Sequence, residues 1–236
     1  MSEHPEYNRD TNPYPSFGKK YNGERAIISL TSWSARINTC SKTIYSLLKN
    51  CPGFHIVLVL SEEEFPKMMD ELPENLKLFV DNELIEILWV YKNYKSFKKV
   101  LFTMDKYRTV PVISADDDCI YTCNYAKMLY DVWYKDNYKI CTFNLYRNLG
   151  FPIQHGPATI YPPYCFLKYG IEKINYNIIK TNQDDVFLGS LANKFKIKIK
   201  EISKTVPYIF HDTINPLSAK TKSPGDTYKI ISKAIK

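Results

Sequence analysis

Three adjacent aspartates, Asp116, Asp117 and Asp118, are the residues best suited to chemistry in this sequence. Neighbouring carboxylates repel one another, so the cluster is unfavourable unless positive charge neutralises it. Hard cations such as magnesium and manganese prefer oxygen ligands and are commonly held by one or two carboxylates together with substrate phosphates. We therefore expect Asp116 and Asp118 to hold Mn2+ or Mg2+, with Asp117 aimed elsewhere. The alternative is a solvated acidic turn.

The elements around this cluster alternate as in a parallel sheet covered by helices. Apolar runs predict strands and amphipathic stretches predict helices. The predicted strands are 26–30, 55–60, 84–90 and 111–114, and the predicted helices are 41–48, 62–72 and 91–108. Such alternation favours an α/β fold with a mostly parallel, Rossmann-like sheet. Ligands bind at the carboxyl ends of strands in these sheets, and the acidic cluster follows one such end directly.

The second half of the sequence is less regular. It predicts helices over 125–133 and 183–195 and strands over 140–145 and 194–200, with a Gly/Pro-rich loop at 150–163 between them. No linker separates two independent domains. We expect one domain with an irregular N-terminal arm at 1–24, a first half at 25–124, a second half at 125–212 and a basic C-terminal tail at 213–236.

The net charge of +7 is confined to the C-terminal end. Residues 193–236 hold ten lysines and three acidic residues, whereas residues 1–192 hold 22 basic and 22 acidic residues. A basic end of this kind favours contact with an anionic membrane surface or an anionic acceptor. A solvated, weakly ordered tail is the other reading.

Several features bear on where the protein works. No run of about 18 apolar residues is present, so no membrane span is expected. The polar N-terminus lacks the apolar stretch of a secretory signal, and a cytoplasmic location is expected. None of the six cysteines forms a CxxC pair, which favours reduced, buried thiols.

Several segments, taken in order, resemble small bacterial, family 2-like glycosyltransferases of the glycosyltransferase A fold. VISADDDCIY is similar to their DXD segment, and AIISLTSWSARINTCSKTIYSLLKN to their first strand and helix. YKNYKSFKKVLFTMDKYRTVPVISADDD resembles the lysine-bearing helix that precedes the DXD strand, while GPATIYPP and NQDDVFLGSL resemble the acceptor loop and the acidic catalytic helix. The resemblance covers roughly residues 25–212. It implies a glycosyltransferase A fold and sugar transfer from a nucleotide-sugar, UDP-linked by preference, in polysaccharide biosynthesis.

The resemblance also assigns roles to individual residues. Asp116 and Asp118 match the outer DXD positions, where the metal would neutralise the leaving nucleoside diphosphate. His211 is a candidate third metal ligand. The nucleotide-sugar would contact the acidic pair, the loop after the first strand and the lysine-bearing helix: Thr31, Ser32, Arg36, Lys95, Lys98, Lys99, Asp116 and Asp117. Among the lysines, Lys98 or Lys99 is favoured. A surface ion pair is the alternative for Arg36, and a solvated helix face is the alternative for the lysines.

The catalytic base is expected at the start of the helix over 183–195. Asp185 is chosen narrowly and Asp184 is its rival, because either carboxylate can take a proton from the acceptor hydroxyl. Acids also stabilise helix N-termini in any protein, which is the structural alternative. His155 and Gly156 lie in the expected acceptor loop, where glycine lets the backbone approach a sugar closely.

Two other activities use similar residues. A nucleotidyltransferase also binds metal through paired aspartates, but it usually carries a Gly-rich loop after the first strand, and this sequence has Ser29 to Ser34 there without glycine. A non-catalytic nucleotide-binding protein is the third hypothesis. Nucleic acid is not an expected partner, because the basic residues form no patch interleaved with aromatics. The expected acceptor is a glycan, a lipid-linked glycan or a protein.

Overall fold

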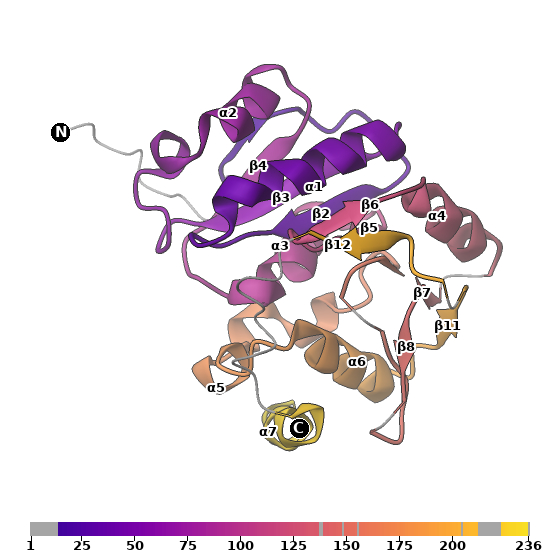
Figure 1. Ribbon diagram of the computed structural model, residues 1–236. Coiled ribbons are helices and arrows are strands. Elements are labelled where there is room, and N and C mark those ends of the chain that lie inside the picture. Colours follow the sequence, from indigo (N-terminus) through magenta and orange to yellow (C-terminus); the bar gives the residue numbers. More distant parts are fainter. Residues whose placement is uncertain are drawn as a thin grey trace.

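The computed structural model describes residues 14–136, 139–147, 149–154, 156–203, 205–211 and 223–235. An eight-stranded sheet runs through its centre in the order β1-β4-β3-β2-β5-β10-β7-β11 (Figure 1). Its strands are β1 Ser16–Gly18, β2 Ile27–Thr31, β3 His55–Ser61, β4 Glu86–Val90, β5 Val112–Ser114, β7 Ile140–Thr142, β10 Thr159–Tyr161 and β11 Ile199–Glu201. The adjacent strands β4, β3, β2 and β5 are parallel, which confirms the predicted sheet. Strand β10 then joins β5 and β7 in antiparallel fashion.

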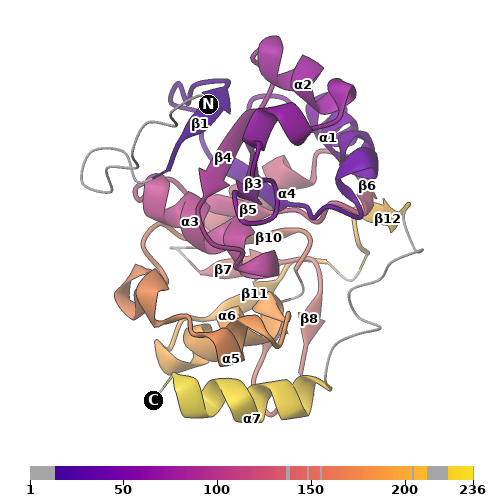
Figure 2. The ribbon, with the colours of Figure 1, turned by 90° about the vertical axis from the view of Figure 1, so that its left-hand side faces the viewer.

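Helices cover both faces of this sheet, as the predicted α/β fold requires. One face packs against α1 Ile37–Asn50, α2 Glu74–Asp81 and α4 Tyr125–Lys135. The other packs against α3 Lys98–Lys106 and α6 Asp184–Lys194, with α5 Tyr176–Ile179 and α7 Pro224–Ala234 beyond them. Figure 2 shows α7 as the outermost layer below α5 and α6. Every residue of β3 is buried, because a central parallel strand is covered from both sides.

Two small ribbons stand beside the main sheet. Strand β6 Cys119–Tyr121 pairs with β12 Tyr208–Phe210, and β8 Leu145–Tyr146 pairs with β9 Ile153–Gln154, both antiparallel. The β6/β12 ribbon lies next to α1 (Figure 1). It therefore brings the end of the second half of the chain to the acidic segment that follows β5.

Five of the expected segments differ in the structure. The acidic stretch 62–72 is not an α-helix, because Pro66 lies inside it, and it holds only a short 3-10 helix at Met68–Glu71. Strands β9 and β10 occupy the expected loop 150–163, and only the end of the expected strand 194–200 is extended, as β11. The N-terminal arm contributes the edge strand β1, and the C-terminal tail contains α7, so neither segment is wholly irregular.

All six cysteines are free thiols, as the sequence predicts, and four of them are buried. Cys165 is partly buried and Cys123 is exposed, so the expectation of burial is wrong for Cys123. Among the described residues, no helix is both long enough and apolar enough to cross a bilayer.

Candidate active site

The three aspartates lie where β5 ends and the chain turns into β6, at the carboxyl edge of the parallel strands. Their side chains alternate in burial along this turn. Asp117 is 3% exposed, whereas the side chains of Asp116 and Asp118 are 27% and 18% exposed. The outer pair therefore reaches toward solvent and Asp117 points into the protein, as the sequence predicts.

Asp117 is held by residues that follow β2. The Ser32 hydroxyl donates to Asp117 Oδ2 at 2.5 Å, and Arg36 Nη2 lies 3.0 Å from Asp117 Oδ1. Arg36 also forms an ion pair with Asp118 through Nη1. Arg36 is only 5% exposed, so the alternative of a surface ion pair is wrong. Burial raises the pKa of Asp117 to about 6 even though Arg36 opposes that rise.

Lys99 bridges two carboxylates from distant parts of the sequence. Its Nζ lies 2.5 Å from Asp116 Oδ1 and 3.2 Å from Asp184 Oδ2, the first residue of α6. Burial alone would lower the pKa of Lys99, but the charges of Asp116 and Asp184 outweigh it and raise this pKa well above its ordinary value. Lys99 thus stays protonated and ties α3, the acidic segment and α6 together.

Gly156 lies directly against this ion pair. A Cβ placed on it would be 3.2 Å from Lys99 Nζ and 3.3 Å from Asp116 Oδ2. Its carbonyl accepts a hydrogen bond from the Ser114 hydroxyl at the end of β5. The backbone before β10 therefore lies so close to the cluster that a side chain at this position would crowd Lys99 and Asp116. His155 lies outside the described residues.

The three candidate lysines occupy different environments. Lys98 is 1% exposed, and its Nζ donates to Asn93 Oδ1 at 2.9 Å. Burial lowers the pKa of Lys98 to about 8. A solvated helix face is therefore wrong for Lys98 and Lys99, whereas Lys95 is exposed. Thr31 donates its hydroxyl to the Val59 carbonyl at 2.6 Å and so braces β2 against β3.

His211 follows β12 and reaches the cluster through its backbone. Its N–H donates to the Asp118 carbonyl at 2.9 Å, while its ring Nε2 lies 3.1 Å from Thr43 Oγ1 on α1. The same Thr43 hydroxyl lies within 2.9 Å of the Asp117 carbonyl and 2.8 Å of the Cys119 carbonyl. The ring of His211 is thus directed to α1 and to the backbone of the acidic segment.

The two aspartates at the start of α6 are placed differently. Asp184 is 7% exposed and bound to Lys99, and burial raises its pKa although the Lys99 charge opposes the rise. Asp185 is half-buried, and its Oδ1 accepts the Val186 N–H at 2.8 Å. Asp184 therefore belongs to the ion-paired cluster, and Asp185 is the more accessible carboxylate.

The donor chemistry of the cluster fits a divalent cation. The described ion pairs use Oδ1 of Asp116 and Oδ2 of Asp118, one oxygen of each carboxylate. Four carboxylates face two ion-paired cations, Arg36 and Lys99, which leaves an excess of negative charge. Within the described residues no three His, Cys, Asp or Glu side chains are gathered as a preformed metal cage. Magnesium-type ions are commonly bound by two carboxylates, and substrate phosphates complete their coordination.

The sequence did not reveal the residues that support the acidic cluster from the interior of the protein. Thr43 donates to the Asp117 carbonyl, and Asn93 accepts a hydrogen bond from Lys98. The Tyr121 hydroxyl accepts the Asp116 N–H at 3.0 Å. Ser29 is another, because its hydroxyl bonds the Lys99 carbonyl and lies 2.7 Å from Thr103 Oγ1. Only Ser29 carried a signal, as a polar residue within an apolar run. The others are brought in by tertiary contacts.

This chain is similar to known proteins in its structure. No protein-family model matches the chain, and no curated protein sequence does. Among solved structures, TarS of S. aureus superposes with a TM-score of 0.56 at 13% identity, over 89% of this chain and 38% of that one. TarS 1–349 in complex with UDP-GlcNAc gives a TM-score of 0.57 at 12% identity, over 89% and 64%.

A third similar structure is the mannosyltransferase PcManGT from Pyrobaculum calidifontis in complex with GDP-Man and Mn2+. Its TM-score is 0.55 at 10% identity, over 95% of this chain and 72% of that one. The chain thus spans between about two fifths and two thirds of the length of the TarS structures it matches. At these identities the likeness concerns the fold, and the chain has the glycosyltransferase A-like fold.

Proposed function

We propose that this protein is a metal-dependent glycosyltransferase that moves a sugar from a nucleotide-sugar to an acceptor. The observation that carries the proposal is the cluster of Asp116, Asp117, Asp118 and Asp184 with Arg36 and Lys99, set at the carboxyl edge of a glycosyltransferase A-like sheet. The similar structures are described as complexes with UDP-GlcNAc, UDP, or GDP-Man and Mn2+.

On the donor side, Asp116 and Asp118 would hold Mn2+ or Mg2+, which supplies positive charge to the departing nucleoside diphosphate. Lys98 lies near the cluster, and its lowered pKa of about 8 leaves it mostly protonated at neutral pH, so it can pair with a phosphate. Ser32 and Arg36 act through Asp117 and Asp118, because both are already bound to those carboxylates. Thr31 positions the loop that carries them.

On the acceptor side, we assign the base to Asp185, which is more accessible than the buried Asp184. Asp185 takes the proton from the acceptor hydroxyl while that oxygen bonds the sugar and the bond from the sugar to the nucleoside diphosphate breaks. Gly156, and with it His155, would line the acceptor entrance. The acceptor is a glycan, lipid-linked or protein hydroxyl, which suits polysaccharide biosynthesis.

Peripheral contact with an anionic membrane is a further part of the proposal. Lys229 and Lys233 on α7 support it, because Lys229 is exposed and both lie on the basic C-terminal end. Changing both to Glu should reduce sedimentation with phosphatidylserine vesicles. Equal sedimentation of the variant and the wild-type protein would remove the membrane from the proposal.

The test of the proposal is a screen of nucleotide-sugars for hydrolysis with and without manganese. A glycosyltransferase should release the nucleoside diphosphate from one of them only when manganese is present. Hydrolysis of a nucleoside triphosphate instead would favour a nucleotidyltransferase, and thermal stabilisation by a nucleotide without turnover of any donor would favour a non-catalytic binding protein.

The same assay tests the base. D185N should keep thermal stabilisation by nucleotide plus manganese but lose about 100-fold or more in turnover, the usual contribution of a general base. D131N changes an exposed aspartate of α4 and is the matched control. Full turnover by D185N would contradict the assignment of the base.

A further inference from the structure

A large aromatic side chain stands exposed beside the acidic cluster. Phe210 is 60% exposed at the end of β12. It lies opposite Cys119 in the β6/β12 ribbon, and the next residue donates its N–H to the Asp118 carbonyl. Leaving a phenylalanine in water forgoes roughly 1.5–3 kcal/mol of burial. An exposed apolar side chain at the rim of a polar site is therefore a candidate contact for a ligand.

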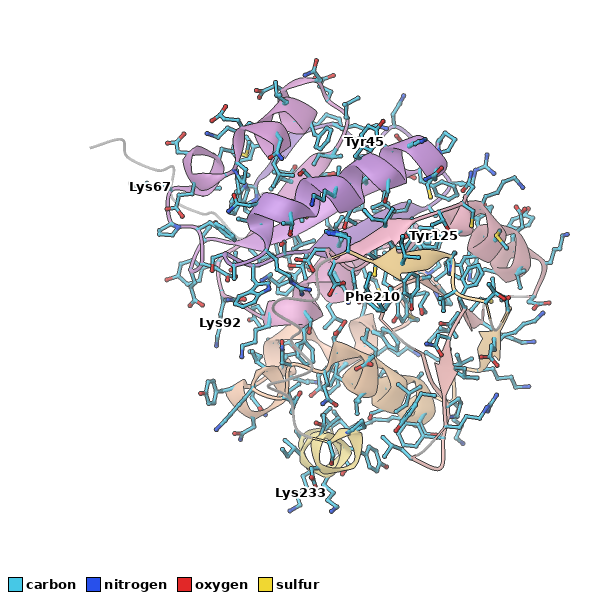
Figure 3. The ribbon with its side chains drawn as sticks, in the orientation of Figure 1. Tyr45, Lys67, Lys92, Tyr125, Phe210 and Lys233 are labelled. Atoms are coloured by element: carbon cyan, nitrogen blue, oxygen red, sulfur yellow. The ribbon has the colours of Figure 1, made fainter. Side chains whose placement is uncertain are left out.

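The neighbouring Ile209 is equally exposed, at 60%, but belongs to the other face of the ribbon. Successive side chains of a strand point to opposite faces. Ile209 pairs with Ile120, which lines a groove along α1. Phe210 shares its face with Tyr208, whose hydroxyl bonds Asn144 just after β7. Phe210 thus faces the second half of the sheet, and Figure 3 shows it below β12, on the side toward α6.

The ribbon holds Phe210 in a fixed place. Backbone hydrogen bonds close both of its ends, from the Thr122 N–H to the Pro207 carbonyl at 3.0 Å and from the His211 N–H to the Asp118 carbonyl at 2.9 Å. The ring also packs edge-on against Tyr208 with centroids 5.6 Å apart. A pre-positioned ring loses little conformational freedom when a ligand stacks on it.

We propose that Phe210 is the platform on which the sugar ring of the acceptor stacks. The inference rests on the proposed function and names the substrate class of the same site. One face of a pyranose presents C–H groups, which pack on the negatively charged face of an aromatic ring. Phe210 stands at the Asp118 end of the cluster, whereas Lys99 binds Asp116 and Asp184 at the other end. We assign the ring stacked there to the acceptor, and separate KM values for acceptor and donor test that choice.

The test compares F210A, F210W and I209A with the wild-type protein. Each is given manganese and the nucleotide-sugar identified in the screen, and the release of nucleoside diphosphate is followed as methyl glycosides of glucose, galactose, mannose and N-acetylglucosamine are added. A glycoside that accelerates release is an acceptor surrogate. We expect F210A to raise the KM for that glycoside about fivefold, the scale of one aromatic stacking contact. F210W should restore it, and I209A should match the wild-type value.

Other outcomes overturn the inference in distinguishable ways. Equal KM values in F210A and I209A, or a rise confined to the KM for the donor, would remove Phe210 from the acceptor site. A wild-type protein that hydrolyses the donor and responds to no glycoside would do the same while leaving the proposed function intact. Failure of every nucleotide-sugar in the screen would refute the proposed function and this inference with it. Thermal melting of each variant confirms that it folds.

Discussion

At the residue scale, the three neighbouring aspartates differ in the direction of their side chains and in the groups that they contact. Asp117 turns inward and binds Ser32 and Arg36, whereas Asp116 and Asp118 face outward and keep one oxygen each outside their ion pairs. The division arises at the turn between β5 and β6, in which Asp117 and Asp118 lie. The sequence predicted that Asp117 would be aimed away from the outer pair across such a turn. It could not reveal Lys99 between Asp116 and Asp184, which depends on contacts across 85 residues.

Gly156 offers a test of how tightly the cluster is packed. In G156A the new methyl group would press on Lys99 and Asp116 and displace them, so nucleotide affinity in the presence of manganese should fall. G225A is the control, because a Cβ there meets its nearest neighbour only at 4.0 Å. Calorimetric titration of both variants checks this. Equal affinities for G156A and G225A would show that the site has room there.

At the element scale, the elements that carry the cluster were predictable and several others were not. Strand β5 and helices α3 and α6 follow from short apolar runs and helical spacing. Strand β10 was hidden because prolines and glycines surround its three residues, yet its central place in the sheet comes from pairing with β5 and β7. Local composition cannot report such pairing, since the partners lie far apart in the sequence.

The helix within the lysine-rich tail belongs to the core. Ile231 of α7 is fully buried, and α7 packs on α6. I231A should therefore lower the free energy of unfolding by about 2–4 kcal/mol, the cost of a cavity at a buried isoleucine. K229A, at an exposed position of the same helix, should change it by less than about 0.5 kcal/mol. Urea denaturation measures both, and a stability loss shared equally by the two variants would contradict the packing of α7.

At the scale of the whole molecule, the two ends of the parallel strands carry different groups of residues. The carboxyl ends carry the candidate site, and the opposite ends carry a buried network around Glu86. Glu86 is 1% exposed and binds His55 Nε2 at 2.6 Å and Lys106 Nζ at 2.5 Å. Lys106 also donates to the Ser16 hydroxyl at 2.8 Å, so the network ties β1 to the sheet. The sequence predicted the sheet but not this anchoring of the N-terminal segment, because His55 alone carried no signal.

Acid should weaken this network in a defined pH range. Burial alone would raise the pKa of Glu86, but the bonds from His55 and Lys106 outweigh it and lower that pKa to about 2, from an ordinary 4.5. A lowered pKa contributes stability above about pH 4.5 and loses it as the pH falls toward 2. E86Q should thus cost about 3 kcal/mol at pH 7 and clearly less at pH 3. Urea denaturation at both pH values checks this, and a cost independent of pH would contradict it.

Asp116 and Asp118 are proposed to hold a divalent cation together with a nucleotide diphosphate. Calorimetric titration of UDP and GDP, with and without manganese, tests it most directly. Manganese should strengthen binding of one nucleotide by at least about tenfold, or 1.4 kcal/mol, in the wild-type protein and in D131N, and this gain should vanish in D118N. Equal affinity with and without manganese in the wild-type protein, or a full gain in D118N, would rule out this metal site.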